Sequence, residues 1–242
     1  AMLMAAGLEV PKKVFAHGWL LVGGEKMSKS KLTGIAPSDI TDHFGVDAFR
    51  YYFLRAIPFG SDGSFSWEDM SARYTSELAN DFGNLASRLA AMIEKYCGGV
   101  LPAVAQDAEL SDSLKATVAK ADAAMQELDF QGGITAIMDF CKQVNGFVTI
   151  KEPWILAKDP ANQAVLEEVL YDTAESLRAL AVLLHPVMPA TTEILWESLG
   201  AKTTLGAIGA QKVSDVATWG QLPQGATVTK TPVLFPRLEV KE

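Results

Sequence analysis

The sequence has 242 residues, 49% apolar and 21% charged, a balance typical of globular proteins and unlike that of disordered or fibrous chains. Its 29 acidic and 21 basic side chains give a net charge of −8, and Cys97 and Cys141 form no CxxC pair, which excludes a Cys-only zinc cluster and a disulfide framework. No apolar run approaches the roughly 18 residues of a membrane span, so we expect one large or two small domains, a cytoplasmic setting and no membrane contact.

The first part of the chain predicts short elements of mixed type. Residues 1–7 (AMLMAAG) have the pattern of the last turns of an apolar helix ended by a glycine. Residues 13–22 form a nearly continuous apolar run, typical of a buried strand in a parallel or mixed sheet. Gly23 and Gly24 predict a tight hairpin. The pattern then predicts two short helices and a Gly/Ser/Pro loop taken as a domain boundary, over residues 37–43, 46–56 and 58–64.

From Ser66 onward the pattern changes to long amphipathic helices. Ser66 and Asp69 have capping-box spacing, and an apolar stripe in steps of three and four extends from Tyr74 to Tyr96 before a Gly-Gly pair ends it. Further stripes follow over residues 110–128, 134–148, 166–184 and 191–199. Helices joined by short connections predict an antiparallel bundle. Beyond it, the apolar run at 232–236 (PVLFP) predicts a tail that docks on another part of the protein.

Charge and histidine placement limit the kinds of site to expect. Residues 71–200 carry 18 acidic and 9 basic side chains, which argues against a general electrostatic footprint on nucleic acid, because phosphate binding draws on clustered Lys and Arg. Any such contact in this region must be local. The three histidines, His17, His43 and His185, have no ligand spacing, so we expect no metal bound by this chain.

One short motif carries chemistry. Residues 26–30 read KMSKS, and the chance of this five-letter word in a chain of this length is on the order of one in ten thousand. Lys26, Lys29 and Lys31 with the hydroxyls of Ser28 and Ser30 present cations and donors from one loop, as a triphosphate requires. A mobile loop is suited to stabilising negative charge that develops in the transition state, because its lysines can approach that charge as it forms. A solvated basic turn is the alternative interpretation.

KMSKS after the apolar run at 15–21 (FAHGWLL) resembles the second signature of class I aminoacyl-tRNA synthetases, and the surrounding text resembles methionyl-tRNA synthetases of the bacterial type. The resemblance covers nearly the whole chain, with a loose match over 200–225. Its further segments are GVDAFRYY at 45–52, FSWE at 65–68, NLASR at 84–88, KEPW at 151–154 and LFPRLE at 234–239.

The resemblance implies an ATP site and a tRNA site. In the family, the lysine equivalent to Lys29 binds ATP phosphates and stabilises the pyrophosphate leaving group as methionine is activated, and the one equivalent to Lys26 assists. The resemblance places the other residues of the motif, Met27, Ser28 and Ser30, in the same ATP-binding loop. Backbone groups near His17 and Leu20 would border the adenosine. ATP with Mg²⁺, methionine and tRNA(Met) are the partners implied.

The resemblance also implies that Asn84, Arg88 and Trp154 read the CAU anticodon. The spacing lends its own support, because Asn84 and Arg88 share a helix face about 100° from the Leu85 core stripe, and Trp154 follows Pro153 where a helix ends. Stacking on an aromatic ring and hydrogen bonds to base edges are how proteins read single-stranded loops. The alternative is a core Trp154 and an Arg88 paired with a surface glutamate.

No HIGH-type motif, which class I synthetases need at the first turn of their nucleotide fold, is present. We therefore expect the carboxy-terminal half of such an enzyme, monomeric and inactive alone in adenylation, its partner the missing amino-terminal half of the catalytic domain. The expected fold is mainly α, with a partial Rossmann-type α/β part, a stem-contact module and an all-α bundle, divided at 1–64, 65–200 and a tail at 201–242 that docks on the catalytic part. Another class Ia synthetase and a non-catalytic tRNA-binding or interaction module remain as alternatives.

Overall fold

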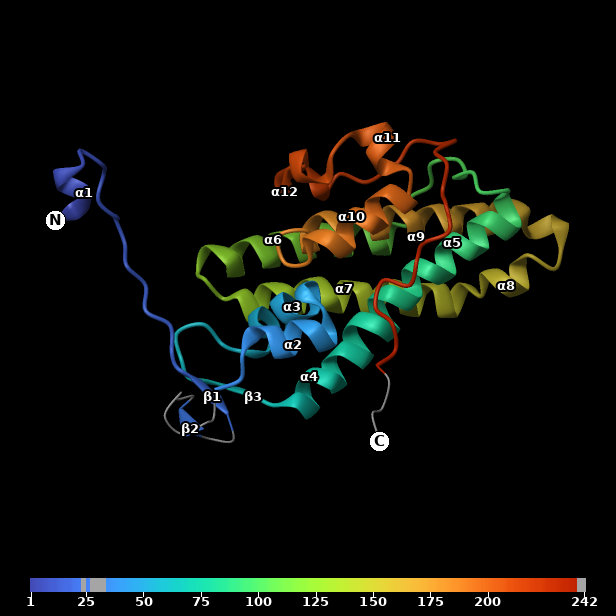
Figure 1. The fold of residues 1–242 in the computed structure, drawn as a ribbon. Helices are drawn as coiled ribbons and strands as arrows, with labels where there is room; N and C mark the ends of the chain where they lie inside the picture. The colour runs from blue at the N-terminus through green and yellow to red at the C-terminus, as the bar shows by residue number, and fades with distance from the viewer. Residues whose placement is uncertain (23–24, 27–33, 239–242) are drawn as a thin grey trace.

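A computed structural model describes residues 1–22, 25–26 and 34–238. Its amino-terminal part contains a small sheet and short helices, of which α1 lies apart from the sheet at the end of an extended segment (Figure 1). They are α1 (Met2–Ala5), β1 (Leu20–Val22), β2 (Glu25–Lys26), α2 (Pro37–Phe44), α3 (Val46–Ala56) and β3 (Gly63–Phe65). The strand order is β2-β1-β3, with β1 antiparallel to β2 and parallel to β3. The mixed sheet and the two short helices are as predicted, and Gly7 has the expected left-handed φ of +70° after α1.

Two predictions for this part are wrong. The strand expected over 13–22 is confined to Leu20–Val22, and Val14 before it is 87% exposed. A strand needs a hydrogen-bonded neighbour, and β2 and β3 reach β1 only at these three residues. The loop expected over 58–64 ends early because Gly63 is the first residue of β3 and pairs with Leu20 of β1. These two residues are 43 positions apart, so local sequence does not reveal the pairing. The hairpin expected at Gly23 and Gly24 lies outside the described residues.

The remainder of the described chain is helical, and the predicted bundle is present (Figure 1). Its long helices are α5 (Asn84–Cys97), α6 (Ala108–Gln126), α7 (Phe130–Lys151), α9 (Gln163–Leu184) and α10 (Pro189–Ser198). Shorter elements are α4 (Trp67–Arg73), α8 (Pro153–Leu156), η3 (Pro160–Asn162), α11 (Ala201–Leu205), η4 (Ile208–Ala210) and α12 (Val213–Val216). Ser66 caps α4 by accepting the Asp69 N–H at 3.0 Å, as its spacing predicts.

A π-helix, η2 (Tyr74–Gly83), joins α4 to α5 without a break. The sequence predicts one continuous α-helix here, so the wider helix is a correction. The apolar residues Tyr74, Leu78 and Phe82 are four apart, and all three are buried. Steps of four suit a helix of larger turn as well as they suit an α-helix, so periodicity alone does not distinguish the two.

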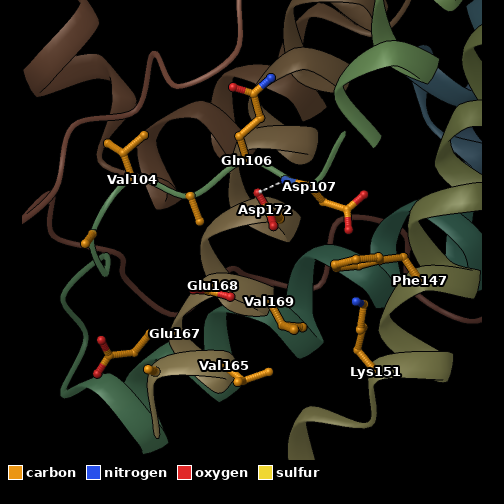
Figure 2. A pocket seen from close by; sticks show the side chains of 13 residues that line it. Val104, Gln106, Asp107, Phe147, Lys151, Val165, Glu167, Glu168, Val169 and Asp172 are labelled. Carbon is orange, nitrogen blue, oxygen red and sulfur yellow. Dashed lines mark hydrogen bonds between the residues drawn. The ribbon is translucent and has the colours of Figure 1, made fainter. Parts of the chain in front are cut away.

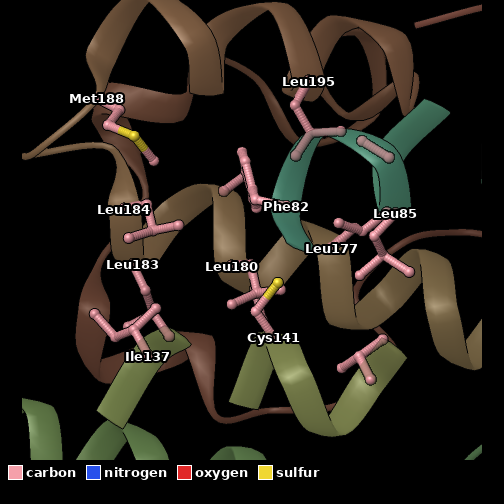
Figure 3. Close-up of a cluster of buried hydrophobic side chains, with 14 of the residues drawn as sticks. Phe82, Leu85, Ile137, Cys141, Leu177, Leu180, Leu183, Leu184, Met188 and Leu195 are labelled. Carbon is pink, nitrogen blue, oxygen red and sulfur yellow. The ribbon is translucent and has the colours of Figure 1, made fainter. Parts of the chain in front are cut away.

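The core of the bundle surrounds α9. Leu177, Leu180 and Leu184 of α9 meet Ile137 and Cys141 of α7 from one side, with side chains of η2, α5 and α10 on the other (Figure 3). Seventeen of the 22 residues of α9 are buried, including Glu175 and Arg178. A helix buried on all faces must satisfy its polar groups internally, and these two form an ion pair of 2.8 Å.

Residues 45–56 are fixed to the bundle. Arg50 donates to the carbonyl oxygens of Pro186 and Val187 at 2.7 and 2.9 Å, and Asp47 accepts the Thr191 N–H at 2.6 Å. These bonds join α3 to the connection from α9 to α10 and to the first turn of α10. The apolar part of α3 therefore belongs to the same core cluster as the bundle helices.

The apolar tail segment at 232–236 packs against the π-helix η2. Phe235 is buried, its ring perpendicular to that of Tyr74 with centroids 5.7 Å apart, and the Tyr74 hydroxyl donates to the Pro236 carbonyl at 2.8 Å. The segment follows η2 and α5 across the bundle (Figure 1). His43 and Phe44 of α2 line a groove with residues 236–238, so the segment reaches the amino-terminal part as well.

Candidate functional site

The structure brings together Arg88 and Trp154, two of the three residues predicted to read an anticodon. The Arg88 guanidinium carbon lies 5.4 Å from the centre of the Trp154 ring, a cation–π arrangement. Arg88 is half-buried, whereas Leu85 and Leu89 on the inner face of α5 are buried. In place of the surface glutamate considered as its partner, Arg88 has an indole.

The path of the chain after α7 places Trp154. Glu152 adopts a left-handed φ of +44°, which turns the chain out of α7, and Pro153 then starts α8 with a preset φ. Trp154 is half-buried and packs partly on the core, so it is less exposed than an indole held outside the bundle. One part of the Trp154 ring contacts the core, and the Arg88 guanidinium lies over one face of the ring.

Asn84 lies at the exposed start of α5, one turn before Arg88. It lines a groove of about 320 Å³ between this helix and the docked tail, together with Asn80, Ser87 and Arg237. Sequence reasoning did not select these last three residues. Asn80 and Ser87 could have been found from their spacing to Asn84, which is four and three residues, but Arg237 reaches the groove only through the tail.

A second groove contains the two residues predicted to border an adenosine. His17 and Leu20 line an apolar groove of about 260 Å³ with Phe53, Phe59 and Phe130. Phe59 is 5.9 Å from the His17 ring and meets Phe130 edge-on at 5.1 Å, measured between ring centroids. The groove therefore joins the strand β1 region to the start of α7.

Most of the predicted phosphate loop lies outside the described residues. Met27, Ser28, Lys29 and Ser30 have no described structure. Lys26 belongs to β2, and its backbone pairs with that of Leu21 in the antiparallel ladder. The first residue of the motif, Lys26, is therefore next to β1, the strand whose first residue, Leu20, lines the apolar groove.

Another groove, of about 430 Å³, contains none of the predicted site residues (Figure 2). It lies where the ends of α6, α7 and α9 meet. Asp107, Glu167 and Asp172 line it with one basic residue, Lys151, whose ammonium is 5.3 Å from the Phe147 ring centre. Burial raises the pKa of Asp172 to about 6, although the Asp107 N–H donates to its carboxylate at 3.2 Å. This acidic lining is unfavourable for phosphate.

Metal ligands and membrane spans are both absent from the described residues. Within residues 1–22, 25–26 and 34–238, no three His, Cys, Asp or Glu side chains are grouped so as to hold a metal ion. In the same part of the chain, no helix combines the length and the apolar character needed to cross a bilayer.

Comparisons with known families divide the chain in two. A family model described as class I (M) tRNA synthetases matches residues 1–90, and one described as the anticodon-binding domain of tRNA ligases matches residues 107–218. Asn84 and Arg88 fall in the first match and Trp154 in the second. The contact between Arg88 and Trp154 therefore joins the two matched regions.

Curated relatives and solved structures agree with these models. The chain is 64% identical to the methionine–tRNA ligase of Streptomyces coelicolor and 43% identical to that of Halalkalibacterium halodurans, in both cases over its whole length. It covers 46% and 36% of those proteins, so it spans less than half the length of the relatives it matches. Mycobacterium tuberculosis methionyl-tRNA synthetase in complex with methionyl-adenylate is similar in structure, with a TM-score of 0.84 and 34% identity over 97% of this chain and 46% of that one.

Proposed function

Because the chain belongs to the methionyl-tRNA synthetase family of class I tRNA synthetases, we propose that it is the carboxy-terminal half of a methionine–tRNA ligase. The whole enzyme would activate methionine with ATP and Mg²⁺ to methionyl-adenylate and transfer it to tRNA(Met). This half would supply the KMSKS loop and the surface that reads the CAU anticodon.

The observation that carries the anticodon role is the contact between Arg88 and Trp154. A guanidinium has planar N–H groups that suit the hydrogen-bond edge of a base, and an indole provides a stacking face. Asn84, one turn before Arg88 and exposed, adds an amide with both donors and an acceptor. A single-stranded loop could therefore be read by these three residues without a broad basic surface, which the acidic bundle does not offer.

The proposed role of the KMSKS loop rests on its charge and on where it begins. Lys29 would stabilise the pyrophosphate that leaves during adenylation, with Lys26 assisting and Ser28 and Ser30 donating hydrogen bonds. In support, His17 and Leu20 share one apolar groove of a size that admits a flat ring, and Lys26, the first residue of the motif, pairs with β1.

We also propose that the 242 residues alone do not form methionyl-adenylate. The sequence contains KMSKS and no HIGH-type motif, and it spans under half of its relatives. Exchange of pyrophosphate into ATP, measured with methionine and Mg²⁺, is therefore expected at the level of a protein-free blank. Exchange above that blank, proportional to the concentration of the purified chain, would contradict this.

The anticodon role is tested by binding to short RNA. A 17-nucleotide stem-loop with a CAU anticodon and three loops that each change one anticodon base are compared by filter binding at fixed salt, since affinities for RNA depend strongly on ionic strength. We expect each change to weaken binding at least several-fold. Equal affinity for all four loops would remove the anticodon role and favour a general tRNA-binding or interaction module.

A further inference from the structure

Asn145 is a polar residue on α7 that the proposed function leaves without a role. Its side-chain Nδ2 donates to the carbonyl oxygen of Asp81 at 3.0 Å and to that of Cys141, one turn back on its own helix, at 3.1 Å. Asp81 lies in the last turn of the π-helix η2, 64 residues away. The amide of Asn145 therefore binds α7 directly to η2.

The place of this bond along η2 matters because of how a π-helix ends. Within η2 each N–H donates five residues back, as the Asn84 N–H does to the Ala79 carbonyl, whereas in α5 the N–H donates four residues back. The change from five to four leaves one carbonyl without a helical donor. The π bonds end at the Ala79 carbonyl, so the carbonyl that is passed over lies directly before that of Asp81, which the Asn145 amide binds. The bond therefore fastens α7 to the turn in which the helical register changes.

The register of η2 sets the direction of the proposed anticodon readers. Asn84 follows η2 directly and Arg88 is one turn further. A π turn holds more residues than an α turn, so returning one turn to α geometry would rotate the following helix about its axis and move Arg88 away from the Trp154 ring. Trp154 in turn follows α7, the helix that carries Asn145.

We propose that Asn145 is a positioning residue for anticodon recognition. Its amide holds the last π turn in place, so that Asn84 and Arg88 on α5 are presented in the right direction beside Trp154. The other end of η2 is held separately, because Glu77 accepts the Tyr51 hydroxyl at 2.6 Å and Arg55 at 3.2 Å. Asn145 would thus act at the end of η2 nearest the readers. The inference rests on the anticodon role proposed above.

The test removes the donor without removing the side chain. Asn145→Leu and Asn145→Asp keep a side chain of similar size and cannot donate from that position. Thr135→Val is the matched control, because Thr135 on the same helix also donates to a backbone carbonyl, that of Gln131 at 2.6 Å, within its own helix and away from η2. Folding of each variant is checked by circular dichroism, and affinity for the CAU stem-loop and its single-base variants is then measured.

We expect both Asn145 variants to bind the CAU loop about 3- to 10-fold more weakly, as for one lost hydrogen bond, and to discriminate less between the loops. Thr135→Val should bind like the unchanged chain. A double-mutant cycle separates positioning from general damage. In an Arg88→Ala background, Asn145→Leu should weaken binding by a smaller factor than it does in the unchanged chain, because one of the two residues that it positions is gone.

The outcomes distinguish this inference from the function beneath it. If the unchanged chain binds all anticodon loops equally, the anticodon role and the inference both fail. If it discriminates but the folded Asn145 variants bind and discriminate as it does, the inference alone is overturned. Effects of Asn145→Leu and Arg88→Ala that simply multiply would also overturn it. Loss of helical signal in both Asn145 variants would identify a purely structural residue, with the same consequence.

Discussion

Replacing Glu175 by glutamine should destabilise the bundle strongly, because its carboxylate is the most highly bonded buried charge in the described structure. Glu175 is 0% exposed. It accepts Arg178 Nε at 2.8 Å and the backbone N–H groups of Gly220, Gln221 and Leu222 at 3.0 Å each. The charge thereby fixes the loop after α12 onto the central helix.

The geometry sets the size of the effect. Glu175→Gln preserves shape and one acceptor oxygen, so three of the four bonds survive. The two from the Gly220 and Gln221 N–H groups become neutral, each weaker by about 1 kcal/mol, and the one from Arg178 loses its ionic partner. The new NH₂ faces the Leu222 N–H, which loses its acceptor at a cost of about 1–3 kcal/mol. Arg178 becomes a buried cation without its anion, although it still donates to the Val216 carbonyl at 3.0 Å. A total loss of about 4 kcal/mol is expected, within the range for breaking a buried pair.

Urea unfolding followed by circular dichroism measures this loss. With a slope of about 2.5 kcal/mol per molar urea, the midpoint should fall by about 1.5 M. Glu168→Gln, at an exposed position on the same helix, is the control and should leave the midpoint unchanged. A midpoint for Glu175→Gln within about 0.4 M of the unchanged chain would refute the view that this carboxylate is charged and holds the loop.

Three single positions allow further predictions. Burial raises the pKa of Asp172 to about 6, so its folded form holds a proton more tightly than the unfolded form. The stability that this group contributes is present below about pH 4 and is lost as the pH rises through 6. Asp172→Asn should therefore raise the free energy of unfolding by about 2 kcal/mol at pH 8 and make it depend less on pH, as measured by urea unfolding at several pH values. Gly200 has φ +71°, and a Cβ added there would lie 2.5 Å from the Thr227 carbonyl oxygen. Gly200→Ala should therefore lower the free energy of unfolding by about 2 kcal/mol or more, which a lower thermal midpoint would reveal. Gly146→Ala, at a helical position with open space around the added Cβ, should raise the midpoint slightly. Trp154→Ala should weaken CAU stem-loop binding by about 1–3 kcal/mol, and Ile155→Ala beside it, 44% exposed, should not; equal effects would make Trp154 structural.

Local patterns were sufficient for the helices of the bundle. The stripes of α6, α7 and α9 and the Ser66 cap depend on residues within one or two turns of each other, so their spacing carries the information. The same holds for the helix face shared by Asn84 and Arg88. The roles of these residues, and those of the KMSKS loop, came from the family resemblance and stay predictions.

What failed depends on partners far along the chain. The strand at 13–22 and the loop at 58–64 were misjudged because β1 and β3 pair across more than 40 residues. The π-helix has the same apolar spacing as an α-helix, and what supports it includes Asn145 on another helix. The contact of Arg88 with Trp154 likewise joins residues 66 positions apart. Non-local contacts of this kind have no signature in a single sequence.

The docking of the tail has a consequence for synthesis of the protein on the ribosome. Tyr74 makes its hydrogen bond with Pro236, 162 residues later. At about 5–20 residues per second, the surface of η2 that receives Phe235 waits roughly 10–30 seconds for its cover. During that interval the nascent chain exposes the apolar groups that the tail later buries, so slowing translation between these points would lengthen its exposure to chaperones and to aggregation.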